Sequence, residues 1–216
     1  MTPFEAVVLC GGRSRRMGQD KAFLDLGRGP LVALVAAAAR RAGAVRVQLL
    51  GGDAPALEQL GLEVVPDRLP GHGPLPALAG ALGRAETEIV FVASCDLVAP
   101  DPAAMAAVVG ALGHDADASI PTIGGRDQYL HAAYRRSLAD LLEAAAATGE
   151  RRLWRALTGI RIVHPDVPAS ATADVDSPDD VRRWRDAAGP PSGPRPTDTL
   201  NPDHSPPIEE RGCGHT

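Results

Sequence analysis

The stretch that decides the fold is residues 5–22, which read EAVVLCGGRSRRMGQDKA. It begins with Glu5–Cys10, a short apolar run that stops at two glycines, and this pattern is typical of a buried strand. Ligands of open α/β sheets bind where the strands end. A ligand site is therefore expected in the loop that follows this run.

That loop combines glycines with positive charge. Gly11 and Gly12 allow the backbone to approach a ligand closely, and successive N–H groups in such a turn form an anion-binding concavity. Four cationic side chains follow within nine residues, namely Arg13, Arg15, Arg16 and Lys21. Guanidinium forks suit phosphate oxygens, and an ammonium acts as a movable point charge. The spacing matches neither a P-loop nor G-x-G-x-x-G, so we expect a different phosphate-binding loop.

Outward from this loop, short apolar segments alternate with alanine-rich helical stretches. The predicted strands are 5–10, 45–50, 62–65, 89–94, 118–123, 129–134 and 160–164, and the predicted helices are 30–42, 54–60, 75–84, 102–112, 137–147, 151–157 and 177–187. This alternation predicts an α/β fold with a mostly parallel sheet and helices on both faces. Asp101 and Ser177 are predicted helix caps. The turn at Gly124-Gly125 predicts an antiparallel excursion.

The composition changes at Gly189. The last 28 residues contain seven prolines and four glycines, and Leu200 and Ile208 are their only aliphatic side chains. Such a segment buries too little apolar surface to offset its ordering entropy. The sequence therefore predicts one domain over residues 1–188, a usual domain size, and a disordered tail over residues 189–216.

Composition also limits the classes of partner. A net charge of -5 and a pI of about 5.7 argue against a broad nucleic-acid surface. No apolar run reaches the roughly 18–20 residues of a membrane span, and the chain does not begin like a secretory signal. Cys10, Cys95 and Cys213 lie far apart without a C-x-x-C pair, which favours a reducing cytoplasm over a disulfide framework.

The stretch LCGGRSRRMGQDKA closely resembles the L-x-G-G-x-S-x-R-M-G-x-D-K-A signature of molybdenum cofactor guanylyltransferases. Further landmarks extend the similarity over residues 5–186: Pro66-Asp67, Gly73-Pro74-Leu75, Cys95-Asp96, the Gly-Glu-Arg-Arg at 149–152 and the Asp-Val-Asp-Ser-Pro at 174–178. The resemblance implies a Rossmann-like sheet of the nucleotidyltransferase type. It also implies transfer of GMP from GTP to the terminal phosphate of molybdopterin, with release of pyrophosphate and a need for Mg²⁺.

The resemblance further implies roles for individual residues. The backbone of Leu9, Cys10 and Gly11 would hold the nucleotide, with Lys21 on the phosphates and Asp67 as a further contact. Separately from the resemblance, Gly12 is expected to bind the nucleotide, because its lack of a side chain leaves room beside the base. Asp96 would contact GTP and hold the metal. We take Arg16, Lys21 and Asp96 as the candidate catalytic residues.

Asp96 also has a physical argument of its own. It follows the most apolar predicted strand, at 89–94, where a carboxylate projects into the ligand crevice. Mg²⁺ typically takes one or two protein carboxylates and completes its shell with phosphate and water. The alternative is that Asp96 caps the helix after Pro100.

Asp174 and Asp176 share one strand face, where the family pattern usually has N-x-N-T-P. This departure leaves two interpretations of Asp176, a second metal ligand or a turn residue before Ser177.

Arg151 and Arg152 either bind the anionic groups of the acceptor or begin a solvated helix. His131 is expected to be a half-buried sheet residue.

Two other functions remain open from the sequence. One is another nucleotidyl transfer, from CTP to molybdopterin or from GTP to a small phosphorylated acid. Gly12 and Asp20-Lys21-Ala22 favour guanine, because the related cytidylyltransferases usually have alanine at the first position and lack the second motif. The other is a non-catalytic nucleotide-binding regulator. The expected partners are GTP, molybdopterin and, in transient contact, cofactor-carrying proteins.

Overall fold

The computed structural model describes residues 2–11, 20–175 and 177–188. The strands are β1 (Phe4–Leu9), β2 (Arg46–Leu50), β3 (Glu63–Val65), β4 (Ile89–Ser94), β5 (Ala118–Ser119), β6 (Thr122–Ile123), β7 (Arg126–Asp127), β8 (His131–Arg135) and β9 (Ile162–Val163). The α-helices are α1 (Leu31–Arg41), α2 (Ala54–Glu58), α3 (Pro74–Arg84), α4 (Pro102–Ala111), α5 (Ala139–Ala147), α6 (Leu153–Ala156) and α7 (Pro178–Ala188). Short 3₁₀ turns are η2 (Lys21–Phe23), η3 (Arg136–Leu138) and η4 (Ala169–Thr172).

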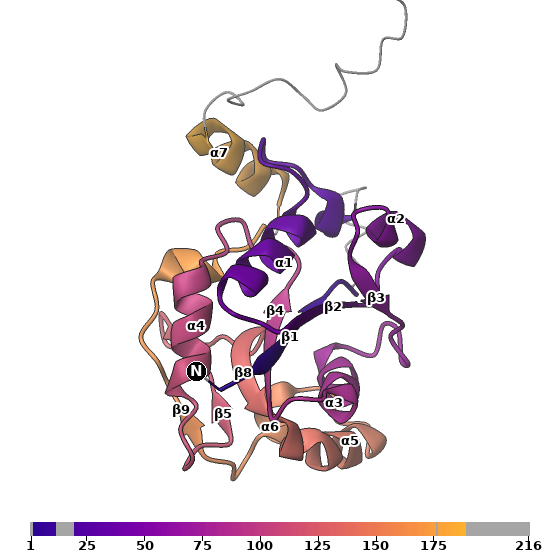
Figure 1. The fold of residues 1–216 in the computed structure, drawn as a ribbon, viewed down its shortest axis with the longest axis vertical. Helices are drawn as coiled ribbons and strands as arrows, with labels where there is room; N and C mark the ends of the chain where they lie inside the picture. Colours follow the sequence, from indigo (N-terminus) through magenta and orange to yellow (C-terminus); the bar gives the residue numbers. More distant parts are fainter. Residues whose placement is uncertain (1, 12–19, 176, 189–216) are drawn as a thin grey trace, which may run out of the picture.

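The main sheet has the strand order β3-β2-β1-β4-β8-β5-β9 (Figure 1). Strands β3, β2, β1 and β4 are mutually parallel, and β5 is parallel to β9. Strand β8 lies antiparallel between β4 and β5. The predicted mostly parallel sheet is confirmed, and the antiparallel excursion is the β6–β7 hairpin followed by β8.

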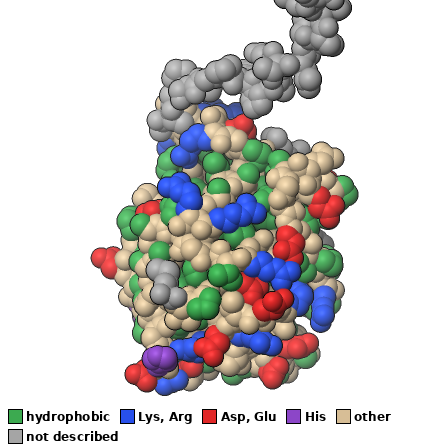
Figure 2. All heavy atoms as spheres, viewed as in Figure 1, with side chains coloured by type: hydrophobic (Ala, Val, Ile, Leu, Met, Phe, Trp, Pro, Cys, Tyr) green, Lys and Arg blue, Asp and Glu red, His purple; other side chains and the backbone are tan. Residues whose placement is uncertain are grey.

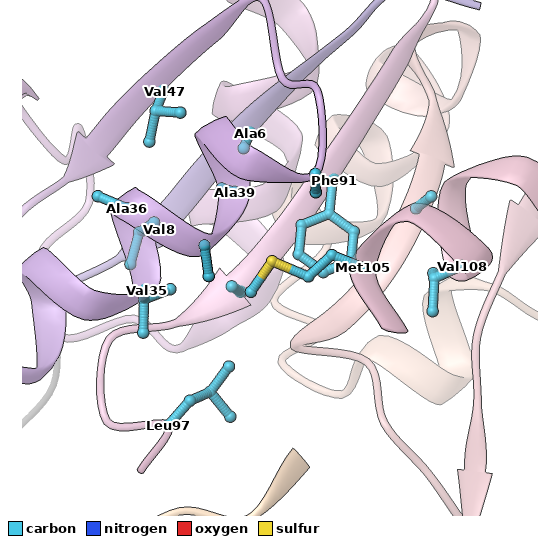
Figure 3. Packing of buried hydrophobic residues seen from close by; sticks show 14 of the residues in the cluster. Ala6, Val8, Val35, Ala36, Ala39, Val47, Phe91, Leu97, Met105 and Val108 are labelled. Atoms are coloured by element: carbon cyan, nitrogen blue, oxygen red, sulfur yellow. The ribbon is translucent and has the colours of Figure 1, made fainter. Parts of the chain in front are cut away.

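Helices cover both faces of the sheet, as predicted (Figure 1). On one face, α1 and α4 pack on the alternate side chains Phe4, Ala6 and Val8 of β1 and on Phe91 of β4. Figure 3 shows Phe91 beside Met105 of α4. On the other face, α3, α5 and α6 pack on the intervening side chains of β1, β4 and β8. This alternation is the period of two expected for a strand buried on both sides.

Helix α7 secures the segment that leads from Lys21 into α1. Val181 of α7 belongs to a separate apolar cluster with Leu24, Leu26 and Leu31, against which Trp184 packs. The helix begins with a reciprocal cap, in which Ser177 and Asp180 exchange side chain-to-backbone hydrogen bonds of 2.9 and 3.2 Å. This confirms the predicted cap.

Several predicted boundaries differ from the structure, including the strands expected at 129–134 and 160–164, and β7 was not predicted. Two of the differences have a clear physical cause. The strand expected at 118–123 splits into β5 and β6, because Pro121 lacks the N–H that a continuous ladder requires. The helix expected from Arg151 begins at Leu153, since Arg152 has an extended backbone and the Glu150 side chain accepts the N–H groups of both arginines. The predicted cap of α4 is confirmed, as Asp101 accepts the N–H of Ala103 at 2.8 Å.

The predicted tail at residues 189–216 lies outside the described residues. Within the described part, none of the helices has both the length and the apolar character needed to cross a bilayer. On the face drawn in Figure 2, the described basic and acidic side chains are interspersed.

Candidate active site

The site is built where two neighbouring parallel strands end. Leu9 of β1 pairs with Ser94 of β4, so the chain leaves both strands at the same edge of the sheet. The N–H of Cys95 donates to the carbonyl of Leu9 at 3.2 Å, which keeps the two exits side by side for one more residue. Gly11 and Asp96 therefore follow adjacent buried cysteines.

Lys21 and Asp96 meet at this edge, although 75 residues separate them. The Asp20 carboxylate caps η2 by accepting the N–H of Ala22 at 3.0 Å, which fixes Lys21 at the start of the turn. Lys21 Nζ lies 3.2 Å from Asp96 Oδ2, and the two side chains are 13% and 15% exposed. Ser94 Oγ donates to the other carboxylate oxygen. Two predicted catalytic residues are thus in contact, and the carboxylate is oriented on both sides.

Two hollows adjoin at this edge. The Asp67 groove has two lobes of about 370 and 460 Å³, which share Gly11, Asp67 and Gly71. The Trp154 hollow, of about 520 Å³, is lined by residues that include Asp96, Asp127, Tyr129, Arg151, Arg152 and Trp154. Pro74, Ser94 and Leu130 line both the smaller lobe and the Trp154 hollow. Asp96 thus lies in the Trp154 hollow two residues after Ser94, which borders both spaces.

The Asp67 groove is formed by loops in close contact. A Cβ on Gly51 would lie 3.4 Å from the Asp67 Cβ and 3.6 Å from the Gly11 backbone, and Gly51 has a φ of 76°. A Cβ on Gly52 would lie 3.0 Å from the Cys10 Cβ. Asp67 is itself oriented by accepting the N–H of Leu69 at 2.9 Å. The loops after β1, β2 and β3 therefore converge, and the double glycine after β2 is the sequence signal for this close approach.

Cys10 and Cys95 pack beneath the groove as free, buried thiols. The hydrogen bond with Cys10 and the burial of Cys95 raise the pKa of the Cys95 thiol well above its ordinary value. Such a thiol is a packing group rather than a nucleophile.

Arg151 and Arg152 are exposed at the Trp154 hollow. Hydrogen bonds from the N–H groups of Arg152 and Arg151 lower the pKa of the Glu150 carboxyl, which anchors this turn. Arg151 Nη1 donates to the carbonyl of His72 at 3.3 Å, beside the loop that lines the Asp67 groove. Both arginines therefore line the Trp154 hollow, and Arg151 alone also contacts the loop beside the Asp67 groove.

Asp174 lines the same hollow as Asp96, because it pairs with Leu97 in an antiparallel bridge. Gly12, Arg16 and Asp176 lie outside the described residues. Their roles, and those of Leu9, Cys10, Gly11 and Asp67, stay predictions.

His131 corrects an expectation, because it is fully buried rather than half-buried, with 1% of its surface exposed. Strand β8 is internal to the sheet, and the Phe91 ring meets the imidazole edge-on at 5.2 Å. Neither ring nitrogen has a hydrogen-bond partner among the described residues. Burial lowers the pKa of His131 to about 4, so the imidazole is neutral at pH 7.

A mixed sheet with Gly11 and the Lys21–Asp96 pair at its carboxyl edge is the arrangement of a nucleotidyltransferase. Residues 6–162 match the family model of the MobA-like NTP transferase domain, and the chain belongs to this family. It is 33% identical over 187 residues to the molybdenum cofactor guanylyltransferase of Rhodobacter capsulatus, covering 83% of this chain and 94% of the relative. The family resemblance of the sequence is thereby confirmed.

Solved structures agree on the fold. The molybdopterin-guanine dinucleotide biosynthesis protein A of Archaeoglobus fulgidus aligns with a TM-score of 0.68 at 24% identity, over 85% of this chain and 98% of that one. The 2-C-methyl-D-erythritol 4-phosphate cytidylyltransferase of Thermus thermophilus aligns with a TM-score of 0.64 at 18% identity, over 84% and 97%. At these identities the likeness shows the fold alone.

Proposed function

We propose that this enzyme transfers GMP from GTP to the terminal phosphate of molybdopterin and releases pyrophosphate. The observation that carries the proposal is the Lys21–Asp96 pair at the edge where the Asp67 groove adjoins the Trp154 hollow. Two substrates that react directly need two adjoining spaces with charged groups at the junction. The family of the chain supports the choice of substrates.

The chemistry asks for alignment and charge neutralisation rather than a covalent intermediate. An oxygen of the acceptor phosphate attacks the α-phosphorus of GTP, the bond to the β-phosphate oxygen breaks, and pyrophosphate leaves. Lys21 holds its ammonium group at this point and neutralises negative charge as it develops. Arg16 is proposed to assist from the same loop, and Arg151 and Arg152 to bind the acceptor's anionic groups.

The Asp67 groove is proposed as the GTP site. The backbone at Leu9, Cys10 and Gly11 would hold the nucleotide, with Gly12 beside the base and Asp67 as a side-chain contact. The converging glycines leave the backbone uncovered there, which a close nucleotide contact requires.

The residues present suit magnesium. Asp96 offers a carboxylate already oriented by Ser94, and Asp174 lines the same hollow. No group of three or more side chains forms a protein cage within the described residues, which fits a metal that keeps water and phosphate ligands. Asp96 would hold the ion, with Asp176 proposed as a second ligand, and the bound ion would supply positive charge to the phosphates.

The proposed setting is the cytoplasm, where the two buried thiols stay reduced. The proposed partners beyond the substrates are cofactor-carrying proteins in transient contact.

One experiment tests the function. The purified chain is incubated with Mg²⁺, molybdopterin and GTP, CTP or ATP in turn, and the products are identified by mass. We expect the guanine dinucleotide and pyrophosphate with GTP only. A product with CTP would favour the cytidylyl alternative, and nucleotide binding without any product would favour a regulator.

A further inference from the structure

The Trp154 hollow contains an unusual share of the chain's aromatic side chains. Only 3% of the residues are aromatic, yet Tyr129 and Trp154 both line this hollow. Trp154 is 54% exposed, whereas the ring of Tyr134 is fully buried in the core. An indole left in contact with water at a hollow offers a large, rigid contact surface for a flat ligand.

Contacts around Trp154 fix its surroundings. The Arg155 guanidinium carbon lies 5.1 Å from the centroid of the indole ring. Arg155 Nη1 is in turn 3.7 Å from Glu150 Oε2, the same carboxylate that binds the backbone at 151 and 152. A ring held in this way loses less conformational entropy when a ligand stacks on it.

Asp127 adds hydrogen-bond acceptors to the same hollow. Its Oδ1 accepts the Thr122 hydroxyl at 2.7 Å, and its Oδ2 accepts the Tyr129 hydroxyl at 3.0 Å. His164 Nδ1 also lies 3.7 Å from Oδ1. A carboxylate has about four lone-pair sites, so these contacts orient the group and leave acceptor capacity, above all on Oδ2. The side chain is 30% exposed, which gives a ligand access to it.

We propose that Trp154 and Asp127 are the residues that select the acceptor by its fused heteroaromatic ring. Trp154 stacks on the face of the ring, and Asp127 accepts hydrogen bonds from the N–H and amino groups on its edge. The acceptor phosphate then points toward Lys21 and Asp96. This inference rests on the proposed function, and it adds the recognition of the ring to that of the phosphate.

Steady-state kinetics with molybdopterin, GTP and Mg²⁺ test the role of each residue. Base–aromatic stacking contributes about 1–3 kcal/mol, so Trp154→Ala should raise the acceptor KM by roughly 5–150-fold. Trp154→Phe, which keeps a ring, should recover most of the loss. Asp127→Asn should raise the acceptor KM at least tenfold (~1.4 kcal/mol), while Thr122→Val, which keeps the carboxylate, should change it far less. The GTP KM should stay unchanged in every variant.

A binding experiment separates failure of this inference from failure of the proposed function. In Trp184→Phe protein, Trp154 is the remaining tryptophan, and titration with free pterin should quench its fluorescence to saturation. Asp127→Asn should weaken that binding by the same factor as the KM change. If molybdopterin is guanylylated but Trp154→Ala leaves the acceptor KM within twofold, ring recognition by Trp154 is wrong and the function stands. Saturable quenching without any guanylyl transfer would keep the ring site and reject the function.

Discussion

The Asp67 groove and the Trp154 hollow adjoin at one edge of the sheet but are built differently. The groove consists largely of backbone, where loops after three parallel strands converge at Gly11, Gly51 and Asp67. The hollow consists of side chains from segments as distant in sequence as Asp96, Asp127 and Trp154. A site built like the groove is encoded in short motifs at strand ends, whereas a site built like the hollow depends on how remote segments pack.

The largest effect is expected at the junction that both spaces share. Asp96→Ala should lower kcat roughly 1,000-fold, about 4 kcal/mol, because it removes the proposed metal carboxylate and the partner of Lys21. Ser94→Ala should cost far less, since it removes only one orienting hydrogen bond. Asp115→Asn, at an exposed position, is the control for the loss of one negative charge. If the kcat of Asp96→Ala stayed within tenfold of the wild-type value, the proposed role of Asp96 in the transfer would be wrong.

The next largest effect is the pH dependence of the free energy of unfolding that arises from His131, which lines the Trp154 hollow. Because the folded-state pKa of His131 is about 4 and its ordinary value is 6.5, the unfolded chain binds more protons between these values. The contribution of His131 to the free energy of unfolding should therefore be fully present above pH 6.5. It should fall by roughly 3 kcal/mol as the pH is lowered toward 4.

Urea unfolding between pH 7 and pH 4 measures this contribution as the difference between wild type and His131→Phe. The phenyl ring keeps the contact with Phe91 and removes the titrating group. Parallel pH profiles of the two proteins would show that His131 does not bind fewer protons in the folded state.

A smaller effect is expected from the backbone contacts of the groove. Gly52→Ala combines a φ of 82° with a Cβ 3.0 Å from both the Cys10 Cβ and the Leu57 Cδ1, so it should destabilise the fold by about 2–3 kcal/mol. Gly61→Ala has a φ of 69° and nothing within 4 Å, so it should cost only about 1 kcal/mol of backbone strain. If both variants lost the same free energy of unfolding in urea, the close contacts around Gly52 would not be what destabilises Gly52→Ala.

The smallest effect separates the two spaces by substrate. Asp67→Asn should raise the Kd for GTP about tenfold, or ~1.4 kcal/mol, and leave the acceptor KM unchanged. Arg152→Gln should raise the acceptor KM and leave the Kd for GTP unchanged. Calorimetry with GTP and steady-state kinetics with molybdopterin measure the two constants. If either substitution moved both equally, the assignment of one space to each substrate would be wrong.

The sequence predicted the parallel half of the molecule closely. Short apolar runs, glycines at the strand exits and capping residues such as Asp101 are local signals, and local signals fix helices, strands and their ends. They failed at Pro121 and at Arg151, where a single missing N–H or one side chain, Glu150, changed the element. Both errors lie in the half of the molecule that contributes most of the Trp154 hollow.

By itself the sequence determined the family and the sheet with helices on both faces. It also predicted the residues of a phosphate loop, because a ligand held by backbone demands a short and recognisable motif. Only the tertiary structure decided that β8 enters antiparallel between β4 and β5, which buries His131 and brings Tyr129 to the Trp154 hollow. Strand order and side-chain convergence depend on contacts between distant residues. A short apolar run records that a strand is buried, but it carries no information about which strand lies alongside.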